Sequence, residues 1–270
     1  MKKIFILMMI AFCGFTIEAK DINLSDVYNY ANKVNMPTSD RELLIPMVIG
    51  SFEGNAEIVY NNASKLSSKG YAIGDYFLGW CYEGGENVPL DLKKAQEYFY
   101  KAATHKDPFN WAYRSLGFSF YDGDYISEDY KEALRWFSKA ADEIQFDAYK
   151  GQSFLVMGII YQGNGNVPPN ELKEYEYFKS SAELGCPWGE EKFAQLLMSS
   201  EKYRNEKEGM FWVEKAAKDG MAFSQFMWGL FLYQDGRKIE GVEFIRKAAQ
   251  QGEYMAIQFM DEFQDLQNNR

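Results

Sequence analysis

Apolar residues recur along most of this chain at the three- and four-residue spacing of an amphipathic helix. Between residues 92 and 102, the apolar face consists of Leu92, Ala95, Phe99 and Ala102. Turns rich in glycine, asparagine and proline separate such stretches. Three of these turns match one another, at residues 83–90, 121–128 and 162–169. The pattern predicts an all-α chain built from helix–turn–helix units.

Two short patterns recur in register and divide the chain into five repeats. The first is a leucine–glycine pair or a close equivalent, as at Leu78-Gly79. The second is a pair of alanines, usually after lysine, with an aromatic residue four positions before its first member. The first members are Ala102, Ala140, Ser181, Ala216 and Ala248, and the aromatics are Tyr98, Trp136, Tyr177, Trp212 and Phe244. Self-similarity of this kind is typical of a repeat architecture.

Each repeat is expected to form two closely packed helices. The glycine of the first pattern lets the neighbouring helix approach, so we expect a looser contact in repeat 4, where Leu197 replaces it. Second helices are expected to begin after a side chain that accepts hydrogen bonds from the first backbone N–H groups. The expected N-caps are Asp91, Asp129 and Asn170, and the expected left-handed C-caps are Gly185, Gly220 and Gly252.

The ends of the chain are imperfect copies of the repeat, as expected for the ends of an array. Residues 20–70 are expected to hold one short helix, a hydrophobic helix that starts near Ser39 and is interrupted at Pro46, and a helix from Asn55 to about Gly70. Residues 253–270 carry one apolar stripe and one polar face, which predicts a C-terminal capping helix.

These residues resemble the Sel-like repeat family, a relative of the tetratricopeptide repeats. Repeat 1 carries Leu78-Gly79, Asp91 and Lys101-Ala102-Ala103 in the order of the family consensus, and the resemblance covers residues 71–252. Repeats 4 and 5 match well in the second helix and poorly in the turn. The resemblance implies a right-handed α-solenoid that binds other proteins, often in the bacterial envelope.

Residues 1–19 have the composition of a secretory signal peptide. Two lysines precede an apolar run from Ile4 to Phe15, and cleavage is expected after Ala19. An uncleaved anchor helix is the alternative. A lipoprotein signal would use Cys13, but Phe12 stands where such signals have a small residue. We therefore expect a periplasmic protein, or alternatively a secreted one, without stable membrane insertion after cleavage.

The charge and the cysteine and histidine counts narrow the possible partners and chemistry. The chain has 39 acidic and 29 basic residues, a formal net charge of -10, which argues against nucleic acid as the main partner and fits a basic protein. With one histidine and three cysteines, a zinc enzyme is excluded by count, and we expect neither a metal nor a cofactor. Cys81 and Cys186 are expected to lie several repeats apart and to be reduced thiols.

Candidate catalytic residues are few, and we expect no enzyme. His105, the sole histidine, is expected in a solvated loop. Ser199 and Lys202 form the Ser-x-x-Lys pattern of β-lactam-acylating enzymes, but the accompanying Ser-Asp-Asn and Lys-Thr-Gly patterns are absent. A calcium loop is disfavoured by the position of its glycine, so a turn and an N-cap explain the local acids better. These acids are Asp122, Asp124, Glu128 and Asp129.

A binding face on the first helices is the stronger candidate. In tetratricopeptide relatives the first helices line a concave surface, so the resemblance implies a partner groove there. Positions six and three before the glycine, and one and four after it, share one side of a helix. They give the candidate partner-binding residues Tyr76, Trp80, Glu83, Trp111, Arg114, Phe118, Tyr121, Gln152, Gln162, Phe223, Phe226 and Tyr233. A core between repeats is the alternative interpretation of such an aromatic stripe.

The leading functional hypothesis is a non-enzymatic exported scaffold that binds a partner protein in its groove. A sharper version follows from the resemblance, because exported family members include immunity proteins. Such a protein would neutralise a toxin that type VI secretion delivers to the periplasm, for example a phospholipase. The alternatives are a general envelope signalling or assembly adaptor, and a β-lactamase-like hydrolase similar to the cysteine-rich relatives.

Overall fold

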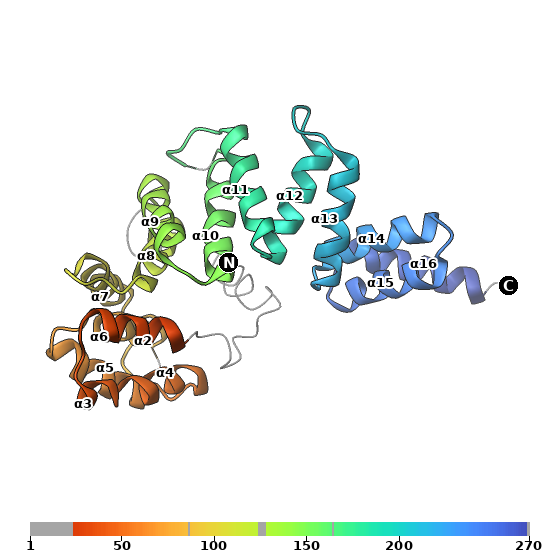
Figure 1. Ribbon diagram of the computed structural model, residues 1–270. Coiled ribbons are helices and arrows are strands. Elements are labelled where there is room, and N and C mark those ends of the chain that lie inside the picture. The colour runs from red at the N-terminus through yellow and green to blue at the C-terminus, as the bar shows by residue number, and fades with distance from the viewer. Residues whose placement is uncertain (1–23, 86, 124–127, 164, 269–270) are drawn as a thin grey trace. The chain divides into compact units, whose positions relative to one another are not determined.

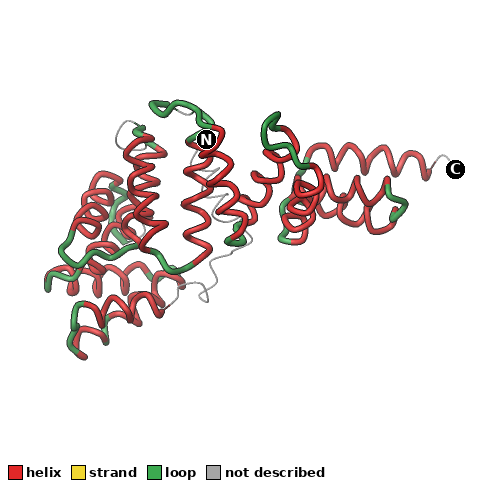
Figure 2. Tube along the Cα trace, turned by 45° about the horizontal axis from the view of Figure 1, so that its top comes forward, coloured by secondary structure: helices red, strands yellow, loops and turns green. Residues whose placement is uncertain are grey.

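The structure is a computed structural model that describes residues 24–268, apart from residues 86, 124–127 and 164. Every regular element in these residues is a helix, and no strand occurs among them (Figure 2). The predicted all-α fold is therefore confirmed. The chain forms two compact units, unit 1 (residues 1–169) and unit 2 (residues 170–270), and each is described by itself.

Unit 1 contains helices α2 to α10 (Figure 1). From α4 to α10, each helix packs chiefly against the next one in the chain. The helices are α2 (Leu24–Lys33), α3 (Thr38–Arg41), α4 (Leu44–Glu53), α5 (Ala56–Ser68), α6 (Ala72–Gly84), α7 (Leu92–Thr104), α8 (Trp111–Asp122), α9 (Tyr130–Glu143) and α10 (Asp147–Ile160).

Unit 2 contains helices α11 to α16, which also pack in chain order. Its last helix, α16, packs on α15 and buries Ala256, as expected for a helix that caps an array. The helices are α11 (Glu171–Glu183), α12 (Pro187–Ser199), α13 (Glu206–Lys218), α14 (Ala222–Gln234), α15 (Lys238–Gln250) and α16 (Tyr254–Asn268).

The helix ends follow local sequence signals. Asp91 accepts a hydrogen bond from the Lys94 N–H, and Asp129 and Asn170 cap α9 and α11 in the same way, so the three predicted N-caps are confirmed. Asn205 caps α13 by the same contact, although the sequence analysis did not single it out. The predicted left-handed glycines are confirmed, with φ values of 74° at Gly185, 95° at Gly220 and 88° at Gly252.

Two helices of a repeat approach so closely that one position in their contact has no room for a Cβ atom. In repeat 1, a Cβ on Gly79 would lie 2.6 Å from the Phe99 ring. In repeat 5 both helices carry a glycine at the contact, and a Cβ on Gly229 would lie 2.7 Å from the Gly241 carbonyl oxygen. In these two repeats the glycine of the first pattern therefore allows the close approach of the neighbouring helix, as expected.

In repeat 4 the glycine lies on the other helix, and the looser contact expected there stays a prediction. Gly209 on α13 faces Leu197 on α12, and a Cβ built on Gly209 would lie 3.5 Å from the Leu197 Cβ. The equivalent position, the fourth residue of the second helix, holds Ala95 in repeat 1 and Gly241 in repeat 5. Close packing requires one very small residue in the pair, and either helix can supply it.

The helices before the repeats are fixed to unit 1 by polar contacts. The Arg41 guanidinium Nη2 donates to the Ala31 carbonyl (3.3 Å), which satisfies the C-terminal end of α2. Asp40 is buried, accepts a hydrogen bond from the Tyr71 hydroxyl (3.0 Å) and pairs with Lys69. The Lys69 ammonium holds the pKa of Asp40 below its ordinary value. These contacts tie α2 and α3 to the start of α6.

The leading helices differ slightly from the predicted boundaries. The short helix expected within residues 20–35 is present as α2. The start expected at Ser39 is displaced, because α3 begins at Thr38 after Pro37. Pro46 does not interrupt α4 but lies in its first turn, where its missing N–H costs no intrahelical hydrogen bond. The helix expected from Asn55 is confirmed, and Asn55 caps it.

A buried acid near the start of a first helix pairs with the lysine of an alanine-pair pattern in each unit. In unit 1, Lys101 Nζ lies 2.7 Å from Asp75 Oδ1. In unit 2, Lys215 Nζ lies 2.7 Å from Glu190 Oε1. Glu190 is fully buried, and this burial raises its pKa to about 7, although Lys215 opposes the shift; Asp219 adds to it. The Glu190 carboxyl group therefore takes up a proton at a higher pH than an exposed glutamate does.

The close helix contact predicts opposite effects for one substitution at two equivalent positions. In Gly241→Ala, the new Cβ would lie 2.6 Å from the Gly229 carbonyl and 2.7 Å from the Tyr233 N, so backbone must move. We expect a loss of about 1–3 kcal/mol in the free energy of unfolding, measured by urea denaturation. In Gly209→Ala, the nearest atom is Cγ of the flexible Met198 at 2.8 Å. Here we expect no loss, or a gain of about 0.5–1 kcal/mol from helix propensity. Equal losses in both variants would contradict this account.

The Glu190 pKa predicts a pH dependence of stability. The folded-state pKa of about 7 lies above the ordinary value of 4.5, so the folded state binds more protons, and stability falls as pH rises from about 4.5 to 7. We expect Glu190→Gln to raise the free energy of unfolding at pH 8 by up to about 3 kcal/mol and to flatten this slope. Urea denaturation at several pH values measures both effects. The control is Glu206→Gln, an exposed acid on α13. If the free energy of unfolding of Glu190→Gln changes with pH in parallel with that of the parent protein, Glu190 is not the source of the pH dependence.

Candidate binding surface

Unit 1 brings most of its predicted partner-binding residues together on consecutive first helices. The helix α6 carries Tyr76, Trp80 and Glu83, α8 carries Trp111, Arg114, Phe118 and Tyr121, and α10 carries Gln152. Gln162 lies in the turn that follows α10 rather than on the helix. Most of these side chains are partly buried, and Glu83 and Gln162 are exposed.

Aromatic rings connect the three first helices into one surface. The Tyr76 and Trp111 rings meet edge to face with centroids 6.2 Å apart, and the Trp111 and Tyr149 rings lie 5.4 Å apart. Tyr76 also packs on Phe77, Phe99 and Phe109 behind it, and burial raises the pKa of its hydroxyl well above the ordinary value. The rings therefore belong to the core on one side and to the surface on the other.

Arg114 lies at the centre of this surface and is held from three directions. Its guanidinium carbon lies 4.9 Å from the Phe118 ring centroid and 5.0 Å from that of Tyr149. Its Nη2 donates to Gln152 Oε1 at 2.5 Å. Stacking between two rings suits a planar guanidinium and fixes its direction. We call this set the first-helix surface: Tyr76, Trp111, Arg114, Phe118, Tyr149 and Gln152.

Other candidate residues of unit 1 lie at the margin of the first-helix surface. Tyr121 packs edge to face on Tyr130 at 5.5 Å, and burial raises the pKa of its hydroxyl. Trp80 is partly buried against the core of unit 1. Tyr149 was missed by the sequence analysis, yet it lies nine residues before the column glycine, so one more helical turn of the same offsets would have included it.

In unit 2 the candidate residues contribute little exposed surface. Phe226 is only 4% exposed and packs in a core with Ile245, Ala248 and Ala256, so its predicted exposure is wrong. The Tyr233 ring meets the rings of Phe259 and Phe263 on α16, at 5.6 Å and 6.4 Å. The capping helix thus covers Tyr233. Phe223 is half-buried at the start of α14.

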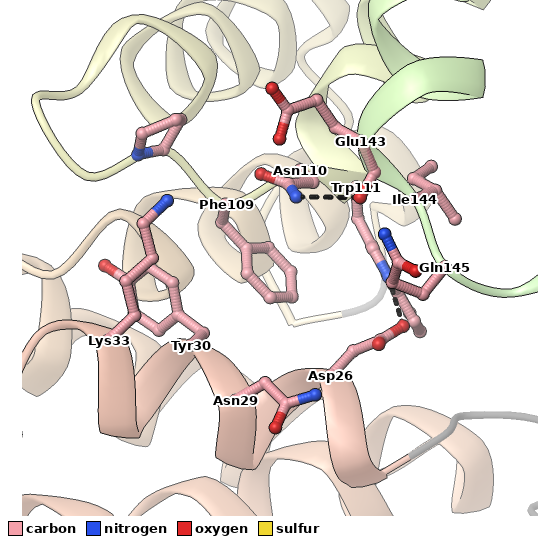
Figure 3. A pocket seen from close by; sticks show the side chains of 11 residues that line it. Asp26, Asn29, Tyr30, Lys33, Phe109, Asn110, Trp111, Glu143, Ile144 and Gln145 are labelled. Carbon is pink, nitrogen blue, oxygen red and sulfur yellow. Dashed lines mark hydrogen bonds between the residues drawn. The ribbon is translucent and has the colours of Figure 1, made fainter.

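The N-terminal helix α2 borders the first-helix surface, a feature that no repeat pattern signals. The Trp111 indole Nε1 donates to Asp26 Oδ2 at 3.3 Å (Figure 3). The Tyr30 hydroxyl accepts a hydrogen bond from the Ala72 N–H at 2.9 Å, and its ring meets Phe109 edge to face at 5.5 Å. Burial raises the pKa of Asp26, although the indole hydrogen bond opposes the shift. One margin of the surface is therefore carboxylate-lined.

The residues of the Ser-x-x-Lys pattern do not form a nucleophile–base pair. The Ser199 hydroxyl donates to the Gln195 carbonyl at 2.7 Å, at the end of α12. Lys202 Nζ lies 4.9 Å from the Tyr203 ring centroid. Activation of a serine needs a base within hydrogen-bond reach, and these contacts direct both groups elsewhere.

The remaining candidate chemistry is explained by local structure. Asp129 caps α9 and accepts a hydrogen bond from Asn166 Nδ2 at 3.0 Å, whereas Asp124 lies outside the described residues. In the part of the chain that the structure describes, no three His, Cys, Asp or Glu side chains gather as metal ligands would. His105 Nδ1 accepts a hydrogen bond from the Asp107 N–H in its loop. Cys81 and Cys186 are buried thiols, as expected.

Solved structures with the same fold support the assignment of a repeat array. One is the protective antigen c5321 of uropathogenic Escherichia coli, with an SLR fold, at TM-score 0.67 and 22% identity. It covers 79% of this chain, and the match spans 47% of that chain, about half its length. A Sel1 repeat protein of Oxalobacter formigenes matches at TM-score 0.62 and 17% identity, over 78% of this chain and 84% of that one. These similarities show the fold alone.

Two further comparisons add little. Immunity protein Pa5087 of Pseudomonas aeruginosa matches at TM-score 0.42 and 17% identity, over 68% of this chain and 67% of that one. This similarity is too low to bear on function. No curated protein matches the sequence significantly.

The family model for the Sel1 repeat matches five segments, which agree with the five repeats found in the sequence. The segments are residues 72–107, 112–143, 157–186, 199–221 and 222–253. Together with the solved structures, they confirm the predicted α-solenoid class. Sel1 repeats mediate binding between proteins, and the family is typically a non-catalytic scaffold. The chain belongs to the Sel1 repeat family.

Proposed function

We propose that this chain is an exported, non-enzymatic binding protein that holds a partner protein on the first-helix surface of unit 1. The observation that carries the proposal is Arg114, fixed between the rings of Phe118 and Tyr149 and bonded to Gln152. A pre-oriented arginine loses little conformational entropy when it binds. Arginine, tyrosine and tryptophan are also the residues that most often dominate binding energy at protein interfaces.

The location of the surface supports the proposal. Three first helices contribute to it, so a partner would contact several repeats at once. Its rings are anchored in the core of unit 1, as the contacts of Tyr76 with Phe77 and Phe99 illustrate. Anchored aromatic groups offer contact area at low entropic cost.

The net charge of -10 favours a basic partner, which long-range attraction would bring to this chain faster. Export is part of the proposal, and the lysines and apolar run of residues 1–19 support it. Neutralisation of a toxin, including one delivered to the periplasm by type VI secretion, is the sharper form of the proposal. The charge suits that form, and the identity of the captured partner tests it.

Affinity capture with matched variants tests the surface. The tagged chain is incubated with periplasmic extract and with culture supernatant, and bound proteins are identified by mass spectrometry. We expect Arg114→Ala to weaken binding of the captured partner by about thirty-fold or more, as for a hot-spot residue, measured by calorimetry. The control is Arg135→Ala, because Arg135 also stacks on an aromatic ring, Trp136 at 4.5 Å, but lies on the second helix α9.

The loss of partner binding in Arg114→Ala, compared with that in Arg135→Ala, shows whether the partner binds on the first-helix surface. Equal weakening in both variants, or none in Arg114→Ala with the fold intact by circular dichroism, would move the binding site away from the first-helix surface. A stoichiometric partner that damages the cell envelope would establish toxin neutralisation. Several weaker partners, lost at high salt, would instead establish an adaptor.

A further inference from the structure

A pocket opens beside the first-helix surface, between α2, the loop before α8 and the loop after α9 (Figure 3). Its volume is about 130 Å³, which equals roughly four water molecules at about 30 Å³ each. A side chain with about four to six non-hydrogen atoms beyond its Cβ fits this space. The pocket is thus sized for one long side chain rather than for a cofactor.

One end of the pocket is negative. Asp26 on α2 lies there, next to Trp111, and its carboxylate accepts the indole hydrogen bond at 3.3 Å. The C-terminal end of α9 contributes Glu143 to the pocket lining, and the Glu143 carbonyl accepts a hydrogen bond from Asn110 Nδ2 at 3.1 Å. Burial raises the pKa of Asp26, and the hydrogen bond from the Trp111 indole opposes this shift.

The middle of the pocket is lined by aromatic rings, and the end opposite Asp26 carries a lysine. The Phe109 ring lies between Tyr30 and Trp111 (Figure 3). Lys33 lies at the end opposite Asp26, two helical turns along α2 and thus about 10 Å away. A residue that enters with a cationic head at Asp26 would place its methylene groups along the rings and its own backbone carbonyl towards Lys33.

We propose that this pocket binds a lysine or arginine side chain of the partner protein, with the cationic head at the Asp26 carboxylate and the aliphatic stem against Phe109 and Trp111. The inference rests on the proposed function, because it names a chemical feature of that partner. The net charge of -10 supports a basic partner. An acidic head in the position proposed for the cation would be repelled by the Asp26 carboxylate, and a neutral apolar side chain there would leave that carboxylate without an opposite charge.

The test uses single-residue probes and does not require the partner. Nα-acetyl-lysine N-methylamide, which keeps its ε-ammonium group, and the equivalent arginine compound are titrated into the ¹⁵N-labelled chain. The Trp111 indole N–H signal is followed by NMR. The signal is assigned by its loss in Trp111→Phe. We expect saturable shifts with millimolar dissociation constants for both probes. Asp26→Asn, which keeps an acceptor for the indole, is expected to weaken binding about ten-fold.

The controls separate a specific pocket from general attraction to an acidic protein. Asp142→Asn, an exposed acid near the end of α9 that does not line the pocket, should leave both dissociation constants unchanged. The Nα-acetyl methylamides of norleucine and of glutamate should bind at least ten-fold more weakly than the lysine probe. The proposal would be overturned if the norleucine compound bound as tightly as the lysine probe, or if the glutamate compound bound more tightly. It would also be overturned if Asp26→Asn and Asp142→Asn weakened binding equally, or if 50 mM lysine probe caused no shift.

This test is independent of the capture experiment. The probe titration reports on the pocket lining, which does not include Arg114, whereas capture of a partner tests Arg114. Probe binding together with failed capture would therefore reject the first-helix surface and keep the pocket. Capture that depends on Arg114, together with no probe binding, would reject the pocket and keep the first-helix surface.

Discussion

The structure depends on helix pairs that approach until one contact position excludes a Cβ atom. At Gly79 the excluded space is filled by the Phe99 ring, and at Gly229 by backbone of the facing helix. Such a contact fixes the rotation of each helix about its own axis, because any turn would bring a side chain into that space. Fixed rotation in turn fixes which side chains emerge on the helix face beside the contact. Trp111 and Arg114 reach one surface for this reason, since they lie six and three residues before Gly117.

Features that depend on local chemistry could be predicted from the sequence, whereas features that depend on a contact between distant segments could not. The caps at Asp91 and Asp129 follow from a side chain and the N–H groups two or three residues later. The compensation of Leu197 by Gly209 involves two helices, and either can supply the missing volume. Periodicity describes one helix at a time, so it could not predict that Gly209 of the facing helix lies opposite Leu197.

The repeat pattern predicted which side chains share one face of unit 1, but it did not predict the contacts made at the ends of the array. The offset rule placed Arg114 and Gln152 on one face, and the structure joins the two by a hydrogen bond. It failed at Phe226 and could not foresee that α16 covers Tyr233, because a capping helix buries the face that an interior repeat exposes. Asp26 belongs to a helix outside the repeat pattern, so no repeat-based signal marks its contact with Trp111.

The charges of the two proposed sites act over different ranges, and this difference bears on specificity. The net charge of -10 attracts any basic protein, but salt screens such attraction beyond about 8 Å at physiological ionic strength. Arg114 has the opposite sign and is partly shielded by two rings, so it acts at contact and is screened less. A partner that is only basic would be drawn in and then repelled at Arg114. Stable binding would require a carboxylate opposite Arg114 within a basic surface, and that combination discriminates one protein from the many that share a net charge.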